Sequence, residues 1–496
     1  MRRGSMALPR LRERGRLAAL FSTVVHRARG QAGWQEMGEP DRRTTRTWQQ
    51  FVLGVVVARS TRLVAVGQAV LGQRAAQSVK AVAMALGYFL SVAKFPAATV
   101  STQVLEAAVR QLDPSQVATY RGKVVLALDP TEYPKRSRGS AGRRTTGKRG
   151  TRDRHMEHVG RVRKPVKGGG GRGRGRRHPR TTGAPHTGVE APRTAAASVA
   201  TTSGYVDVWA GLVLTGKQFL PLARALFSNR HPTLTSQNKG EEAVLAAGLA
   251  LLERLGWAAI LVADRGFGRK ELLVQLVGQD RDFVIRVDAD FTVFTAVHPN
   301  GALLGTVLAA QPVLGEVVWD RGQEGTLRCA ARTVTATIRF SRTGRQTDYT
   351  EATLQVIELR PLDGVTTPLV LATTLPVEPL TPLAAIKGVV RVYAMRWAIE
   401  TAFETMKAWG LGRFMVRSWQ AIDRVLWLVA IAYALLVVAT RDGPLTILRA
   451  QVILLLKRLA TPSRQFTVGK LAEAIGLDYQ RHRRAWTTAW ASLWLT

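Results

Sequence analysis

The sequence holds a single cysteine, Cys329, among its 496 residues. One thiol excludes a disulfide within the chain and a zinc cluster built from several cysteines. Long apolar runs are also missing. The longest covers residues 425–439, 15 residues, whereas a membrane-spanning helix needs about 20. We therefore expect a buried core helix there and no membrane partner. Residues 1–6 are basic and lack the apolar core of a signal peptide. We therefore expect a bacterial, cytoplasmic protein that is associated with the nucleoid.

Acidic residues are scarce, with 35 Asp and Glu against 71 Lys and Arg and a net charge of +36. A hydrophobic fraction of 46% excludes a chain that is disordered throughout. Such an excess of positive charge repels itself unless a polyanion neutralises it. Nucleic acid is the first candidate partner, and an anionic membrane surface is the second.

Composition and periodicity divide the chain. Residues 135–193 hold 19 Lys or Arg and three acidic residues, a net charge of +16. They cannot bury a core, which predicts a disordered Arg/Gly-rich insertion. Helical spacing from about residue 48 predicts a helical scaffold or a basic DNA-binding domain. The predicted units are a helical N-terminal domain (1–115), an α/β core (120–290 and 377–415), a β-rich insertion (291–376) and a helical C-terminal region (416–496).

Two aspartates each follow a short apolar run that is typical of a buried strand. Asp129 follows residues 123–128, and Asp264 follows residues 258–263. Catalytic groups and ligands collect at the carboxyl ends of strands in α/β sheets. Two carboxylates placed there repel each other unless a divalent cation holds them, and oxygen ligands suit Mg²⁺ or Mn²⁺. A helix cap or a turn is the alternative interpretation of either aspartate.

A third acid lies on a predicted helix covering residues 383–408. On one continuous helix, Tyr393, Arg396, Glu400 and Lys407 form a stripe about 60° wide. A solvated face explains the charges but not the tyrosine. Glu404 lies on the same stripe, so spacing alone does not single out Glu400.

The pattern Tyr393-x2-Arg396-x3-Glu400-x6-Lys407 resembles the YREK signature of insertion-sequence DDE transposases of the insertion-sequence-four-like group. Asp264-Arg265-Gly266-Phe267 resembles the family's context for the second acid. A first acid on strand one and a β-rich insertion before the glutamate are also family features. The resemblance covers residues 120–410 and implies an RNase H-like core.

The resemblance implies that Asp129, Asp264 and Glu400 are the catalytic and metal-binding residues. They would hold two Mg²⁺ or Mn²⁺ ions roughly 3.5–4 Å apart. Tyr393, Arg396, Lys407 and Arg265 would contact DNA, namely the terminal inverted repeats of a transposon and its target. Cutting in related transposases passes through a DNA hairpin, and Trp319 is the candidate to stack a flipped base, or else an ordinary core residue. A homodimer on paired ends is expected.

The Arg/Gly-rich stretch departs from the family pattern, because it directly follows the first catalytic strand. It would be a DNA-binding arm that acts by counterion release, or a segment that disrupts the core. An inactive, decayed transposase or another non-enzymatic DNA-binding protein is therefore the alternative function. A nuclease that cuts without strand transfer is a third possibility.

Overall fold

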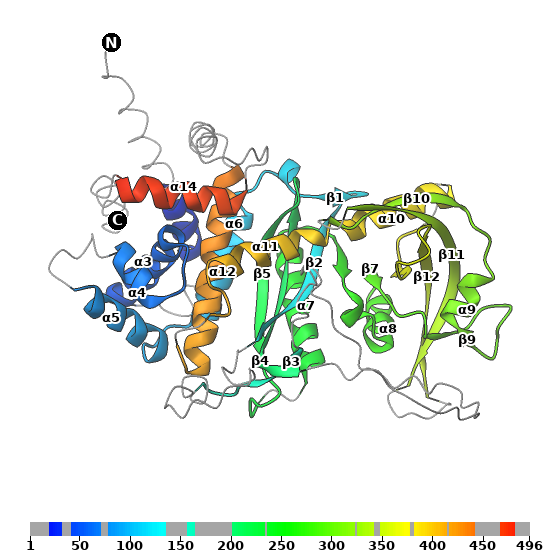
Figure 1. Ribbon diagram of the computed structural model, residues 1–496, viewed down its shortest axis with the longest axis horizontal. Helices are drawn as coiled ribbons and strands as arrows, with labels where there is room; N and C mark the ends of the chain where they lie inside the picture. The colour runs from blue at the N-terminus through cyan, green and yellow to red at the C-terminus, as the bar shows by residue number, and fades with distance from the viewer. Residues whose placement is uncertain are drawn as a thin grey trace, which may run out of the picture.

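The computed structural model describes residues 19–31, 41–70, 78–134, 156–163, 201–233, 236–322, 325–341, 348–376, 381–413, 416–441 and 467–481. Their fold is mixed α/β, and its main element is a sheet of eleven strands. Figure 1 shows the central strands of this sheet between helices of the two chain ends on one side and its curved, β-rich continuation on the other.

The centre of the sheet carries three antiparallel strands followed by two strands parallel to the first. Strand β2 pairs antiparallel with β4, and β4 pairs antiparallel with β5. On its other side β2 pairs parallel with β6, and β6 with β7. The bounds are β1 (Thr119–Tyr120), β2 (Lys123–Pro134), β4 (Thr201–Leu214), β5 (Gln218–Phe227), β6 (Ala259–Ala263) and β7 (Asp282–Arg286).

Helices cover both faces of this central part. Helix α7 (Gln237–Arg254) packs with Gly248 against Ala210, where an added Cβ would meet the Ala210 Cβ at 3.2 Å. The neighbouring Trp209 ring instead contacts Phe403 of α11 (Trp397–Ala408). Since successive strand residues point to opposite faces, α7 and α11 lie on opposite faces of the sheet. Helix α8 (Lys270–Gly278) packs on β7, and α10 (Pro382–Ala394) on β6 and β7.

The β-rich stretch continues the central sheet, because β13 pairs antiparallel with β7. The sequence pattern indicates strands here but not their partners. The strands are β10 (Gly315–Asp320), β11 (Thr326–Phe340), β12 (Thr350–Pro361) and β13 (Leu369–Thr373), with β8 (Thr292–Val293), β9 (Ala302–Leu303) and α9 (Leu304–Ala309) beside them.

The N-terminal and C-terminal helices pack together. Helix α12 (Trp419–Arg441) contacts α3, α5, α6 and α14 as well as β5. The prediction of a buried helix at residues 425–439 is confirmed: α12 is long and apolar enough to cross a membrane, yet 94% of its apolar window is buried inside the protein, as in a core helix. The other helices are α3 (Arg42–Ala58), α4 (Leu63–Val70), α5 (Val79–Ser91), α6 (Ala97–Val109), α14 (Val468–Arg481) and the short 3₁₀ helix η2 (Pro114–Gln116).

Residues 156–163 are the described part of the Arg/Gly-rich insertion. Strand β3 (Gly160–Arg163) pairs antiparallel with the start of β4, so the predicted lack of regular structure does not hold there. The Tyr205 hydroxyl donates to the Glu157 carbonyl oxygen at 2.6 Å, and the Trp419 backbone N–H donates to the Glu157 carboxylate at 2.7 Å. These contacts fix the segment to β4 and α12. The remainder of the insertion lies outside the described residues.

Candidate active site

Asp129 and Asp264 lie beside each other where the parallel pairing of β2 and β6 ends, at the carboxyl side of that pairing. The parallel pairing of β2 and β6 ends at Leu128 and Ala263, and the two aspartates are the next residues of each strand. The expected juxtaposition therefore arises from register. The structure corrects one detail, since β2 continues to Pro134 and does not end at Asp129. Among the described residues, β4 alone pairs with β2 beyond Leu128. Proline is tolerated on such an unpaired side of a strand because no partner needs its missing N–H.

The Asp129 carboxylate is buried, with 9% of the residue exposed. Its Oδ1 lies 3.6 Å from Nη1 of Arg396. Burial raises the pKa of Asp129 to about 7; Arg396 and Lys407 act against this, and the charges of Asp264 and Glu400 add to it. Asp129 is thus electrostatically coupled to both other acids of the predicted set.

Asp264 is half-buried and directly follows β6 at the start of the 3₁₀ helix η4 (Arg265–Phe267). Its side chain makes no capping hydrogen bond, which removes the helix-cap interpretation. Gly268 lets the loop return closely, since an added Cβ there would meet the Arg286 carbonyl oxygen at 2.5 Å. Arg265 is exposed, and its Nη1 pairs with Asp288 at 3.1 Å.

The predicted helix over residues 383–408 is two helices, because α10 ends at Ala394 and α11 begins at Trp397. At the junction, backbone N–H groups donate three residues back, as from Arg396 to Tyr393 at 3.0 Å. This tightened turn contains neither proline nor glycine. We attribute it to tertiary pairing, since the turn buries Arg396 between two acids.

Arg396 connects the third acid to the first. Its Nη2 lies 2.6 Å from Oε1 of Glu400, while its Nη1 faces Asp129. Burial raises the pKa of Glu400, Arg396 counteracts it, and Asp264 and Glu404 contribute further increases. Glu404 is exposed one turn later. The geometry therefore favours Glu400 over Glu404 as the third acid.

The other predicted DNA contacts differ in access. Tyr393 is only 3% exposed, and burial raises its pKa to about 12. Lys407 is exposed, although desolvation by nearby protein lowers its pKa against the charges of Asp129, Glu132 and Glu404. Lys407 and Arg265 can therefore reach a phosphate in this conformation, whereas Tyr393 lies beneath Arg396, whose guanidinium is 5.7 Å from its ring centre.

Trp319 does not fit the base-stacking role. It is 7% exposed on β10, and its indole Nε1 finds no hydrogen-bond partner in the described part of the chain. Arg321 covers it, with Cζ 5.5 Å from the ring centre. A buried ring offers no face to a flipped base, so the structure supports the core interpretation.

The structure adds Arg286, which sequence reasoning missed. It ends β7, one residue past the pairing of Ala263 with Ile285, so it lies next to Asp264 at the same edge. Its charge acts to lower the pKa of Tyr393. Within the described residues, no hydrogen bond or ion pair occupies its half-buried side chain. The available signal was an arginine ending an apolar strand.

The three carboxylates offer hard oxygen donors of the kind Mg²⁺ and Mn²⁺ prefer. Among the residues that the structure describes, however, no three acidic, histidine or cysteine side chains are grouped to hold an ion. Arg396 instead supplies the positive charge between Asp129 and Glu400. The donor chemistry fits a divalent cation, and Asp129, Asp264 and Glu400 are the residues that would hold it.

Residues 231–435 match the family model of the transposase DDE domain. A search of curated proteins finds no match. The matched range contains Asp264 and Glu400, while Asp129 precedes it. The match supports a DDE transposase, a metal-dependent class of enzyme that acts on DNA, and it implies an RNase H-like fold.

Proposed function

We propose that the protein cuts and joins transposon ends, with Asp129, Asp264 and Glu400 as its catalytic acids. The observation that carries the proposal is the convergence of Asp129 and Asp264 at adjacent strand ends, with Arg396 tying Glu400 to the same place. The spacing of Tyr393, Arg396, Glu400 and Lys407 further supports the insertion-sequence-four-like group.

Divalent ions at this site, two in our proposal, would supply Lewis-acid stabilisation of the phosphodiester oxygens. The protein's own part is to hold the carboxylates in a partly buried place, where charges interact more strongly than in open water. Arg396 neutralises Asp129 and Glu400 until its guanidinium binds a DNA phosphate instead. Lys407, Arg265 and Arg286 offer further cationic groups around the acids. Tyr393 supports Arg396 from below.

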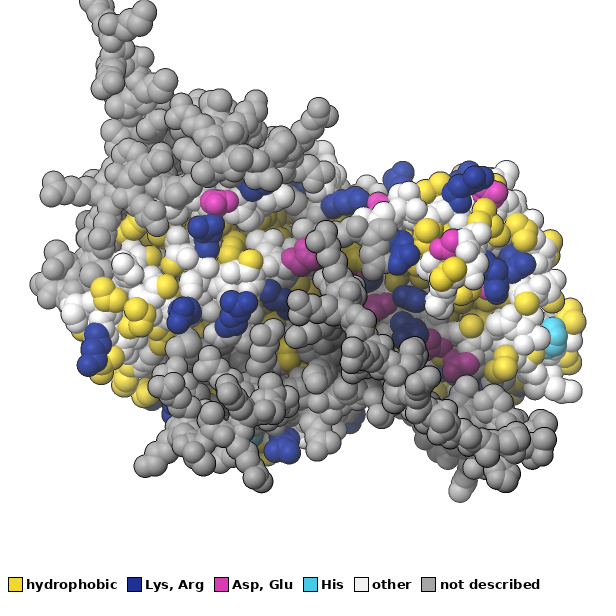
Figure 2. All heavy atoms as spheres, viewed as in Figure 1, with side chains coloured by type: hydrophobic (Ala, Val, Ile, Leu, Met, Phe, Trp, Pro, Cys, Tyr) yellow, Lys and Arg dark blue, Asp and Glu magenta, His cyan; other side chains and the backbone are white. Residues whose placement is uncertain are grey.

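Double-stranded DNA is the proposed substrate, as transposon terminal inverted repeats and target. On the face in Figure 2, Lys and Arg side chains are spread from the helical part to the β-rich part of the described surface. The net charge of +36 favours binding to a polyanion. We propose that the N-terminal helices recognise the ends, that the Arg/Gly-rich insertion adds affinity independent of DNA sequence, and that a homodimer forms on paired ends in the cytoplasm. A hairpin intermediate is part of this proposal.

The test is cutting of the element's own ends with Mg²⁺ or Mn²⁺ by the wild type and by Asp264→Asn. The substitution keeps the size of the side chain and removes its charge. We expect the wild type to cut and the variant to bind the ends without cutting. Equal cutting by both proteins would remove Asp264 from the site.

A decayed transposase that only binds DNA is the second candidate. Two observations favour it. Arg396 already neutralises two of the three acids, and the described residues show no group of three ligands. A wild-type protein that binds its own ends but does not cut them with either metal would support this candidate.

A further inference from the structure

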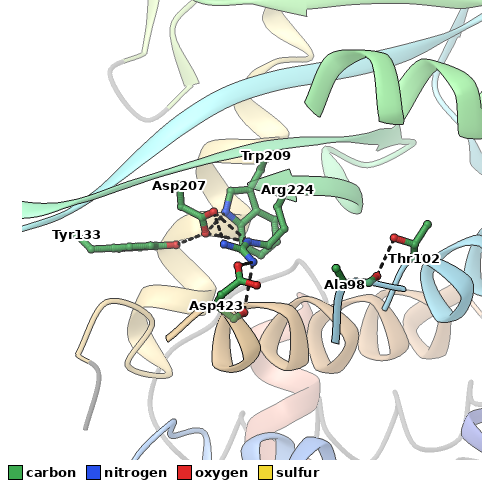
Figure 3. A network of polar contacts seen from close by, with 7 residues as sticks. All are labelled: Ala98, Thr102, Tyr133, Asp207, Trp209, Arg224 and Asp423. Atoms are coloured by element: carbon green, nitrogen blue, oxygen red, sulfur yellow. Dashed lines mark hydrogen bonds and ion pairs between the residues drawn. The ribbon is translucent and has the colours of Figure 1, made fainter. Parts of the chain in front are cut away.

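A buried network of charges lies next to the proposed active site (Figure 3). Asp207 of β4 is fully buried, and its Oδ1 lies 2.7 Å from Nη2 of Arg224 on β5. Nη1 of Arg224 reaches Oδ1 of Asp423 on α12, also at 2.7 Å. Trp209 Nε1 donates to Oδ2 of Asp207 at 2.6 Å, and the Tyr133 hydroxyl donates to the same atom at 3.1 Å. The network therefore joins β2, β4, β5 and α12.

The network shares a sheet face with Asp129. In the antiparallel register, Asp129 is paired with Trp209, and Thr131 with Asp207. Paired residues in antiparallel strands lie side by side on one face. Trp209, held by Asp207, is thus the cross-strand neighbour of the first catalytic acid.

The same tryptophan contacts the helix that carries the third acid. Its ring centre lies 6.0 Å from that of Phe403 in an edge-to-face arrangement. Phe403 follows Glu400 by three residues, which is about one turn of α11. One side chain therefore contacts both the strand of Asp129 and the helix of Glu400.

Helix α12 gives the network a firm base. Arg424, next to Asp423, is buried and donates from Nη1 to the carbonyl oxygens of Phe89 at 3.1 Å and Leu90 at 2.9 Å. These carbonyls belong to the end of α5, where a cation is favoured by the helix dipole. Neighbouring residues of α12 thus fix it to the N-terminal helices and to the catalytic sheet.

Stability alone does not account for such a network. Burial raises the pKa of Asp207 to about 6 even though Arg224 counteracts it, so the carboxylate is held at the expense of its hydration. Apolar side chains of similar volume are often at least as stabilising as a buried ion pair. Paired charged groups do add geometric specificity, so this network is suited to holding side chains in one orientation.

We propose that Asp207, Arg224 and Asp423 are positioning residues of the active site. They set the orientation of Trp209 and thereby the spacing between Asp129 on β2 and Glu400 on α11. The inference rests on the proposed cutting reaction, since it concerns the same carboxylates. It predicts that a loosened network slows cutting and raises the metal concentration needed for it, with DNA binding preserved.

Asp423→Asn is the main variant, because 31% of the Asp423 side chain is exposed and the Asp207–Arg224 pair remains intact. Asp207→Asn is the second variant. The matched control is Glu358→Gln, which removes a buried carboxylate of the same sheet that pairs with Arg332 at 2.9 Å and Arg360 at 2.7 Å in the β-rich region. Asp423→Glu tests whether restoring the charge restores the rate.

For each protein, the melting temperature, the affinity for end DNA and the single-turnover cutting rate at increasing Mn²⁺ are measured. Misplacement of catalytic groups by about 1 Å can slow a reaction about 100-fold. We expect both network variants to cut about 10- to 100-fold slower, to need more Mn²⁺ and to bind DNA within about twofold of wild type. Glu358→Gln should cut at the wild-type rate even if its melting temperature is as low as that of the network variants. Asp423→Glu should recover most of the wild-type cutting rate.

Cutting by folded Asp423→Asn at the wild-type rate and Mn²⁺ concentration would overturn the inference, as would an equal loss in Glu358→Gln. If Asp207→Asn does not fold, Asp423→Asn decides the question. A wild-type protein that does not cut would refute the proposed function itself, and the inference with it.

Discussion

Replacement of Asp129 by asparagine should stabilise the metal-free protein at pH 8 while it abolishes cutting. The pKa of Asp129 is raised by burial to about 7 from an ordinary value of 3.8. Between about pH 4 and 7 the unfolded chain therefore holds fewer protons at this residue than the folded protein does. The free energy of unfolding then falls as the pH rises through this window.

The size of the effect follows from the two pKa values. The interval from 3.8 to 7 is about three pKa units, and each unit corresponds to about 1.4 kcal/mol, so ionised Asp129 destabilises the fold by about 4 kcal/mol at pH 8. Asparagine avoids this cost, and the attraction of Arg396 needs no separate subtraction because it already contributes to the pKa of Asp129. The expected gain is therefore about 4 kcal/mol at pH 8, and it should vanish near pH 4.

Urea unfolding in EDTA at pH 4 and pH 8 measures this difference. The control is Glu404→Gln, which removes an exposed carboxylate from the same side of the site and should change the pH dependence far less, because its charge affects the pKa of Glu400 less than burial and Arg396 do. Added Mg²⁺ should stabilise the wild type, since a ligand of the folded state shifts unfolding, but not Asp129→Asn. The reasoning would be refuted by an asparagine variant that is less stable than wild type at pH 8. It would also be refuted if the stability gain of the variant at pH 4 were as large as its gain at pH 8.

Other predictions concern catalysis and DNA affinity. Glu400→Gln should slow cutting by about 1,000-fold, because it loses metal stabilisation of several kcal/mol and each 1.4 kcal/mol costs about tenfold in rate. Glu404→Gln should cut within about threefold of wild type. Comparable losses in the two variants would reopen the choice of third acid. Arg286→Gln should slow cutting about tenfold, because one contact to a DNA phosphate is lost. Arg265→Gln should slow cutting less, because the Arg265 guanidinium is already paired with Asp288. Equal cutting rates for Arg286→Gln and wild type would exclude a phosphate contact by Arg286. Deletion of residues 164–193 should make the salt dependence of DNA binding shallower, and an unchanged slope would contradict the proposed arm.

Local patterns of the sequence predict the strands that bear the acids. Residues 123–128 and 259–263 are short apolar runs, and both are buried strands with an aspartate directly after the shared pairing. The carboxylates meet because the two strands are parallel neighbours, which the apolar runs alone do not specify. The fold and match support the coarser class, a DDE transposase with an α/β fold.

Long-range contacts explain what sequence reasoning missed. The junction between α10 and α11 arises where Arg396 pairs with Asp129, far away in the chain. Apolar periodicity shows that residues 425–439 are buried but not that α12 packs on the N-terminal helices. It likewise predicts strands in residues 291–376 without the pairing of β13 with β7. The burial of Trp319 depends on those pairings, so its residue type alone could not decide between base stacking and a core position.

The most direct test of the central claim is a crystal structure of the protein on its own transposon-end DNA with Mn²⁺, in which anomalous scattering locates the metal. Our account predicts manganese bound by carboxylate oxygens of Asp129, Asp264 and Glu400, with Arg396 turned from the acids to a DNA phosphate. Manganese bound elsewhere, or held by Glu404 in place of Glu400, would contradict it.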